Sequence, residues 1–139
     1  MSPVDERAVE HATGEIAARL LADLDGLVDG AVEYYAANVA EYRALPAAIL
    51  HEDVGAVTRA NLQWFLEHVH DEEQRRRFAF DATQSGMARR ARQGVSLAAT
   101  LKVVRLFGRY AWNAVRTAAT PGDAVETEAA LRLVAPLME

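Results

Sequence analysis

The sequence predicts an all-α fold, a single bundle of five to six helices. Apolar residues recur at intervals of three and four along successive segments, which is the spacing of one helix face, and no useful stretch alternates as a half-buried strand would. Prolines, glycines and capping residues stand where these segments begin or end. The 139 residues, 51% of them hydrophobic, suit one domain that can bury a core. We therefore treat residues 1–139 as one all-α domain.

The first two helices are predicted from a cap signal at one end and a proline at the other. Ser2 is expected to cap a helix that begins at Pro3. A break or bend is expected at Asp25-Gly26, and Pro46 ends the second helix because the residue before a proline avoids the α region. The expected inward residues are Val9, Ala12, Ile16, Leu20 and Leu24, then Val28, Val32, Tyr35, Val39 and Tyr42.

A third helix is expected at about residues 51–69 and a fourth at about 72–93. The acidic start of the fourth helix suits the positive end of a helix dipole, and Gly94 is expected to end this helix in the left-handed conformation. The expected inward residues are Val54, Val57, Asn61, Trp64 or Phe65, and His68 in the third helix, and Phe80, Met87 and Ala91 in the fourth.

Two further helices complete the predicted bundle. Ser96 is expected to cap a fifth helix at about 97–119, and the turn 120–123 starts a sixth helix that runs through Ala124, Leu131 and Val134. The chain then ends on the apolar stretch LVAPLME. Such an ending is typical of a domain cut from a longer protein, and we expect this chain to be such a fragment.

Charge is segregated along the chain. Residues 1–74 carry 15 acidic and 4 basic side chains, whereas residues 75–116 carry 10 basic side chains and one acidic residue, Asp81. The net charge of the whole chain is −5. This segregation bears on partners and internal pairing, not on the fold. Fourteen arginines against a single lysine, with abundant alanine, indicate a GC-rich bacterial genome.

Residues 88–110 superficially resemble a DNA-reading helix-turn-helix. That motif needs small and apolar residues at set offsets from its turn glycine. Around Gly94 these offsets hold Arg90, Gln93 and Thr100 instead, and the helix that follows is too long for a recognition helix. We therefore expect no direct nucleic-acid binding by this chain.

The fifth predicted helix carries a basic stripe, because Lys102, Arg105, Arg109 and Arg116 share one face together with Asn113. Three interpretations stay open. The stripe can be a solvated edge that pairs with acids of the first three helices, a strip that binds an anion or a partner, or a nucleic-acid groove, which the acidic remainder of the chain disfavours. Leu106 and Trp112 flank the stripe and indicate a second packing surface, which is either another helix of this chain or a dimer partner.

The sequence offers little for catalysis or metal binding. It has no cysteine, and His68 and His70 are two residues apart on a helix, so they point in different directions. No phosphate loop or nucleophile motif is present. We expect no enzymatic activity, no metal site and no cofactor; haem ligation by His68 is the cofactor alternative. Asn61 lies on an otherwise apolar face, so it either caps a neighbouring helix or lines a small-molecule pocket with Trp64, His68 and Tyr110.

The stretch RRARQGVSLAATLKVVRLFGRYAWNAV, residues 89–115, resembles a motif of bacterial regulators. It is similar to the N-terminal domain of PucR/CdaR-type transcriptional regulators and to the related N-terminal domain of RsbR-type (RsbRD) stress-response antagonists. The motif is a helix that ends in a basic residue and glycine, followed by a helix rich in leucine, arginine and aromatics. Residues 39–45 and Asn61-Leu62 resemble earlier landmarks, whereas Lys102-Val103-Val104 departs from a Tyr-Arg pair common in relatives. The residues that fit are Arg90, Gln93, Gly94, Val95, Leu97, Leu101, Arg105 and Trp112.

The resemblance implies an all-α input domain, globin-like without haem in its RsbR relatives and usually dimeric. We expect the signal-input and dimerisation domain of a bacterial transcriptional regulator whose DNA-binding domain lies outside this chain. An RsbR-like module for stressosome-type assembly and a haem or small-molecule sensor are the alternatives. The expected partners are a second copy, the C-terminal domains of the same protein and a small-molecule effector. No run of apolar residues approaches the length of a membrane span, and we expect a cytoplasmic location.

Overall fold

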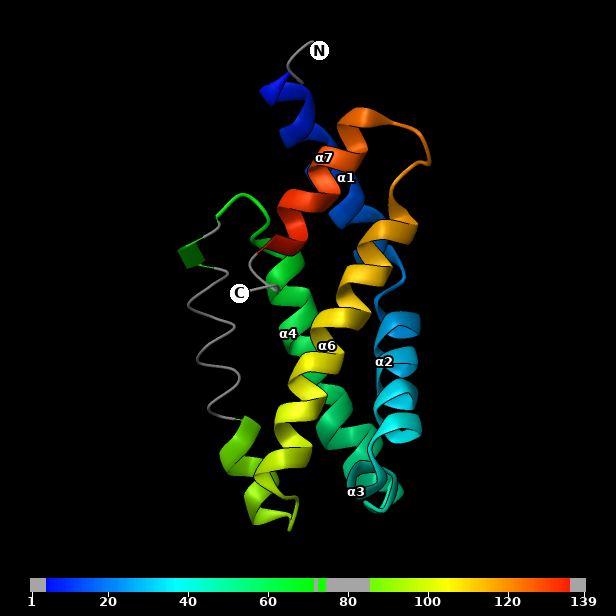
Figure 1. Cartoon of the computed structure of the whole chain (residues 1–139), viewed down its shortest axis with the longest axis vertical. Helices are drawn as coiled ribbons and strands as arrows, with labels where there is room; N and C mark the ends of the chain where they lie inside the picture. The colour runs from blue at the N-terminus through cyan, green and yellow to red at the C-terminus, as the bar shows by residue number, and fades with distance from the viewer. Residues whose placement is uncertain (1–4, 72, 75–85, 136–139) are drawn as a thin grey trace.

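The computed structural model describes residues 5–71, 73–74 and 86–135, and these residues form helices and turns without any strand (Figure 1). The all-α prediction is confirmed. Residues 86–92 are also helical and precede α6. The other elements are α1 (Glu6–Ala22), α2 (Leu24–Asn38), the short α3 (Ala40–Arg43), a π-helix η1 (Ile49–Val54), α4 (Gly55–Glu67), α6 (Leu97–Ala118) and α7 (Ala124–Val134).

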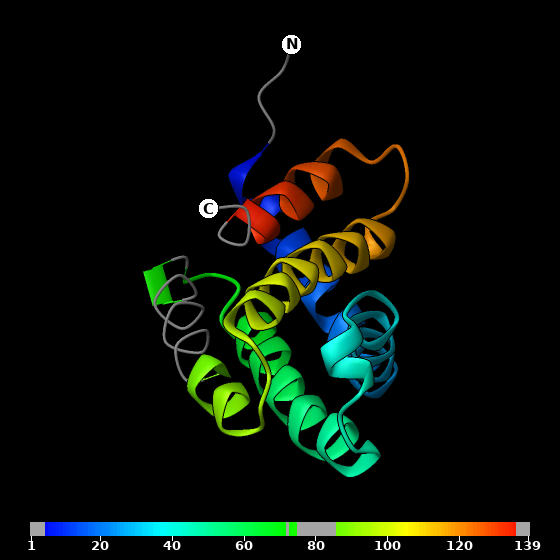
Figure 2. The same ribbon diagram turned by 60° about the horizontal axis from the view of Figure 1, so that its bottom comes forward.

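The long helix α6 connects the two halves of the bundle. Its N-terminal half packs on α2, and its C-terminal half packs on α1 and α7 (Figure 1). Seen from the turned direction, α6 lies between α7 on one side and α4 on the other (Figure 2). α6 therefore contributes buried residues to both halves of the bundle.

The core has two main clusters. Around α1, α4 and α7 the buried residues are Val9, Ala12, Ile16, Ala17, Leu20, Phe65, Leu66, Val69, Val115, Ala129, Ala130, Leu133 and Val134. Around α2, η1 and the first half of α6 they are Ala31, Val32, Tyr35, Val39, Tyr42, Leu50, Val54, Val95, Ala99, Val103 and Leu106. In the second cluster the rings of Tyr35 and Tyr42 meet edge to face, with 6.3 Å between their centroids.

The buried tyrosines keep hydrogen-bond partners for their hydroxyl groups. Burial raises the pKa of Tyr35, although a hydrogen bond with Thr58 acts in the opposite direction. Burial also raises the pKa of Tyr42, whose hydroxyl is close to Thr100 and Arg90. Buried polar groups without partners cost free energy, so these pairs explain why two phenols are tolerated in the core.

Three predicted helix boundaries were wrong. The first helix begins at Glu6, because Asp5 has an extended backbone and its carboxylate accepts from the Arg7 N–H at 3.0 Å. Ser2 and Pro3 lie outside the described residues. The break between α1 and α2 falls at Asp23, whose φ of −117° and ψ of 33° are not helical, and not at Asp25-Gly26. The second helix ends at Asn38, before the extended Val39 and well before Pro46.

The inward face of the third predicted helix was placed one residue out of phase. The π-helix η1 ends at Val54, which is buried as predicted, and the buried residues that follow are Thr58, Leu62, Phe65, Leu66 and Val69. The expected inward residues Val57, Asn61, Trp64 and His68 are only half-buried. A π-turn holds more residues than an α-turn, so it shifts the phase of the helix that follows it.

The predictions around Gly94 are mostly confirmed. Gly94 has a φ of +81°, the left-handed conformation expected of it. Ser96 caps α6, because its hydroxyl accepts from the Ala99 N–H at 3.1 Å. Ala91, expected to face inward, is exposed, and Phe80 lies outside the described residues. The buried residue of segment 86–92 is Arg90, which fits the family motif of residues 89–115 but was not expected to face inward.

The sixth predicted helix is present as α7, with Asp123 as its cap. The Asp123 carboxylate accepts from the Glu126 N–H at 3.1 Å. Val134 is buried, but Leu131 is 48% exposed and faces outward.

Candidate functional site

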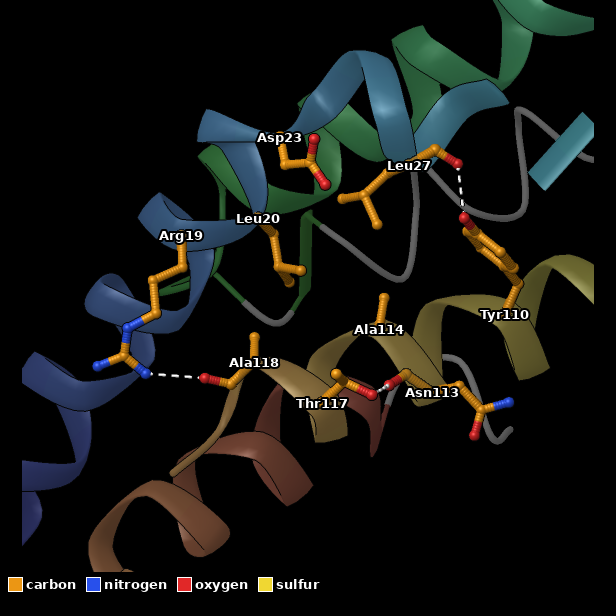
Figure 3. Close-up of a pocket in the computed structure, with 9 residues that line it drawn as sticks. All are labelled: Arg19, Leu20, Asp23, Leu27, Tyr110, Asn113, Ala114, Thr117 and Ala118. Carbon is orange, nitrogen blue, oxygen red and sulfur yellow. Dashed lines mark hydrogen bonds between the residues drawn. The ribbon is translucent and has the colours of Figure 1, made fainter. Parts of the chain in front are cut away.

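An open groove of about 440 Å³ lies where the junction of α1 and α2 meets the C-terminal half of α6 (Figure 3). This volume falls in the range of small-molecule sites. Most of the lining is apolar, and small side chains on α6 create the space. The lining residues are Arg19, Leu20, Asp23, Leu27, Tyr110, Asn113, Ala114, Thr117 and Ala118.

Two hydrogen bonds between side chain and backbone tie the walls of the groove together (Figure 3). At one end the Arg19 guanidinium donates to the Ala118 carbonyl oxygen at 2.8 Å and to the Glu126 carboxylate at 2.5 Å. At the other end the Tyr110 hydroxyl donates to the Leu27 carbonyl oxygen at 2.9 Å. These bonds fix α6 against α1 and α2 and leave the space between them unfilled.

Two glycines on α2 shape the same region. A Cβ atom on Gly26 would lie 2.6 Å from a carboxylate oxygen of Asp23, and one on Gly30 would collide with the Tyr110 hydroxyl. Glycine at these positions lets both polar side chains lie close to the α2 backbone. This is the physical reason why α2 tolerates two glycines despite their low helix propensity.

The electrostatics of the groove are set by an unpaired carboxylate. Asp23 stands at the N-cap of α2, a position where aspartate usually accepts a backbone N–H, yet its side chain makes no capping hydrogen bond. Within the described part of the chain no cation lies at ion-pair distance from it. Burial raises the pKa of Tyr110, and the charges of Asp23 and Glu33 raise it further, as expected in a negative potential.

Arg19 does not supply a free positive charge to the groove. Glu126 holds its guanidinium at 2.5 Å and Glu15 lies at 3.6 Å. The hydrogen bond to Glu126 raises the pKa of Arg19. A hydrogen bond from Arg19 likewise lowers the pKa of Glu126. The charge of Arg19 is therefore balanced by Glu126 and Glu15. Asp23 is the other charged residue of the lining, and it has no ion-pair partner among the described residues.

Of the four residues predicted to form a pocket, only Tyr110 lines this groove. Trp64 and His68 come together elsewhere on α4: their rings stack with centroids 3.9 Å apart, and His68 Nδ1 lies 2.8 Å from the Trp64 carbonyl oxygen. Asn61 is half-buried on the same helix. The groove residues that sequence reasoning missed come from α1, α2 and α6, and the local sequence contains no signal that brings these helices together.

The basic stripe lies on the exposed face of α6, as its spacing predicted. Lys102 donates to the Asn38 carbonyl oxygen at 2.9 Å, and Arg116 lies 3.4 Å from the Asn113 amide oxygen. Among the described residues, no carboxylate forms an ion pair with Arg105 or Arg109. The pairing with acids of the first three helices, one of the three interpretations, is therefore not seen in this part of the molecule.

Beside these cations α6 exposes apolar side chains. Leu97, Leu101 and Val104 are 62%, 40% and 36% exposed and share one face because of their spacing. Leu106, one of the two predicted interface residues, is instead buried against α2, whereas Trp112 is half-buried against the cluster of α1 and α7. We call the surface formed by Leu97, Leu101, Val104, Arg105 and Arg109 the outer face of α6.

A partly buried ionic network joins segment 86–92 to the π-helix. The Asp53 carboxylate accepts from Arg89 at 2.7 Å and from Arg90 at 3.2 Å. Gln93 bridges Arg90 and Asp53, because its amide oxygen accepts from Arg90 and its amide nitrogen donates to Asp53. The Arg90 side chain is only 4% exposed. Burial raises the pKa of Asp53, but the hydrogen bonds from Gln93 and Arg89 outweigh this and leave the pKa below its usual value.

No group of three or more potential metal ligands occurs within residues 5–71, 73–74 and 86–135. In the same ranges no helix combines the length and the apolar composition that crossing a bilayer requires.

The family model of the N-terminal domain of the RsbT co-antagonist protein RsbRD matches residues 25–139, which is most of the chain. No curated protein and no solved structure matches the chain.

Proposed function

The chain belongs to the RsbRD N-terminal domain family, and from this premise we propose that it is a non-catalytic regulatory domain that works by docking to other protein surfaces. In this role it acts at the N-terminus of a longer bacterial cytoplasmic protein. It passes a change in its own packing or pairing to the domains that follow.

The outer face of α6 is the observation that carries the proposal. Protein contact sites combine exposed apolar side chains with arginines, a residue type enriched in such interfaces. Leu97 and Leu101 provide the apolar part, and Arg105 and Arg109 provide cations without an acidic partner among the described residues.

We assign this face to a second copy of the chain. A homodimer of this kind is isologous, so the same patch serves both subunits and apolar residues of one copy cover those of the other. We expect the arginines beside the patch to meet acidic side chains that flank the patch of the partner copy, since residues 1–74 carry a large excess of acids. Both contributions favour association, and the second weakens with salt.

The protein that contains this domain is proposed to be of the RsbR type, since the family that matches is that of an RsbT co-antagonist. The PucR/CdaR-type transcriptional regulator is the second candidate, favoured by the motif at residues 89–115. The domain downstream of residue 139 in the full-length gene separates them. A sulphate-transporter-like domain supports the RsbR type, and a helix-turn-helix supports the transcriptional regulator.

The docking role is tested by the mass of the chain in solution, measured by light scattering over a range of concentrations and salt. We expect Leu101→Ser to weaken association, whereas Leu131→Ser, which removes a leucine of similar exposure from α7, leaves it unchanged. Arg105→Glu should weaken association most at low salt, with Arg7→Glu on α1 as the matched control. A wild-type chain that stays monomeric at all concentrations would contradict the assignment to a second copy.

A further inference from the structure

We propose that the groove between α1, α2 and α6 binds a small amphiphilic amine, with the ammonium group against Asp23 and the apolar body along Leu20, Leu27 and Ala114. This site is separate from the outer face of α6, and the proposal does not rest on the docking role.

The sign of the ligand charge follows from the lining. Asp23 lacks a capping hydrogen bond and an ion-pair partner among the described residues, so its carboxylate is available to a ligand. Arg19, the cation of the lining, is already held by Glu126, Glu15 and the Ala118 carbonyl oxygen. Arg109 and Arg116 belong to the exposed stripe of α6 and do not line the groove. An ammonium group therefore meets an unmatched charge, whereas a carboxylate ligand would meet Asp23 as a like charge.

The shape of the ligand follows from the apolar walls. Leu20 and Leu27 face Ala114 and Ala118 across the groove, so the floor offers carbon contacts and few hydrogen-bond partners (Figure 3). Tyr110 stands at one end, and its ring provides a face on which an ammonium group can also rest. The hydroxyl of Tyr110 is occupied by the Leu27 carbonyl oxygen, so this residue acts as a wall and not as a donor to the ligand.

The probes are three compounds with the same six-carbon body and different heads: hexylammonium, hexanol and hexanoate. Binding is measured by amide chemical-shift changes in two-dimensional NMR spectra of the whole chain, which also identify the residues affected. We expect millimolar affinities for such small probes. Hexylammonium should bind about fivefold more tightly than hexanol, the size of an exposed ion pair, and hexanoate should bind most weakly. The shifts should centre on residues 19–27 and 110–118.

Two kinds of variant separate the charge from the space. Asp23→Asn should remove the preference for hexylammonium over hexanol, whereas Asp29→Asn, which neutralises another exposed acid further along α2, should retain it. Ala114→Leu should fill the groove and abolish binding of all three probes. Thr117→Leu at the exposed rim serves the same purpose should Ala114→Leu fail to give a dispersed spectrum.

Equal affinities of the three probes for the wild-type chain, or a preference for hexanoate, would overturn the proposal. It is likewise overturned by shifts that centre outside the groove, or by a cation preference that persists in Asp23→Asn. None of these results bears on self-association through α6, so failure here leaves the docking role to its own test.

Discussion

Replacing Asp53 with alanine should destabilise the chain strongly, because this carboxylate is the acidic partner of a buried arginine. The Arg90 side chain is 4% exposed, and among the described residues Gln93 and the Tyr42 hydroxyl would remain as its side-chain partners. Removing one member of a buried ion pair costs about 3–5 kcal/mol. Because Arg90 retains polar neighbours, we expect a value of about 3 kcal/mol, at the lower end of this range. For a chain of this size that lowers the melting temperature by about 10 °C.

The assay is urea unfolding monitored by circular dichroism. The dependence of the unfolding free energy on urea concentration is compared between variants. Asp25→Ala is the matched control, since Asp25 also pairs with an arginine, Arg59, but is 86% exposed, and we expect only a small change. The double variant with Asp53→Ala and Arg90→Met should be more stable than Asp53→Ala alone, because it removes the stranded charge. A double variant no more stable than Asp53→Ala would refute the reasoning.

The remaining predictions use the same unfolding assay. The pKa of Asp53 is lowered in the folded chain, so its stabilising contribution is complete above the unfolded value of about 4 and is lost as the pH falls through the folded pKa. The difference between wild type and Asp53→Ala should therefore shrink below about pH 4, and a constant difference would contradict this sign. Gly94→Ala should cost about 1 kcal/mol or more because of the positive φ. Ser96→Ala should cost about 1 kcal/mol through loss of the α6 cap. Leu133→Ala should cost about 2–5 kcal/mol, since this side chain is fully buried.

Local chemistry explains which features could be predicted from the sequence. The all-α class follows from hydrophobic spacing, and the ends at Gly94 and Ser96 follow from residues that suit those backbone positions intrinsically. The breaks at Asp23 and Val39 carry no comparable signal, because neither residue is a proline or a glycine. Val39 is buried, so packing accompanies the second boundary. The first was predicted at Asp25-Gly26 because glycine has a low helix propensity, yet Gly26 lies within α2.

The candidate sites were harder to predict, because they depend on residues far apart in the chain. Asp53 and Arg90 are separated by 37 positions, and nothing in either local sequence pairs them. The groove likewise depends on how closely α6 approaches α2, which Gly30 and Tyr110 determine together. By contrast, the exposed stripe on α6 was predicted correctly as a surface, since a single helix contains it.

The shared helix α6 allows a last prediction, that amine binding and self-association influence each other. Ala114 and Ala118 line the groove, and Leu101 and Val104 lie on the outer face of the same continuous helix. A bound amine that changes how α6 packs on α1 therefore also changes the position of the outer face. Linkage requires that the factor by which saturating hexylammonium changes the dimer association constant equals the factor by which dimerisation changes the amine affinity. Sedimentation with and without the amine gives the first factor, and NMR titrations at low and high protein concentration give the second. If both factors equal one, the groove and the outer face act independently. Amine binding then has no effect on self-association through α6, and the prediction is wrong.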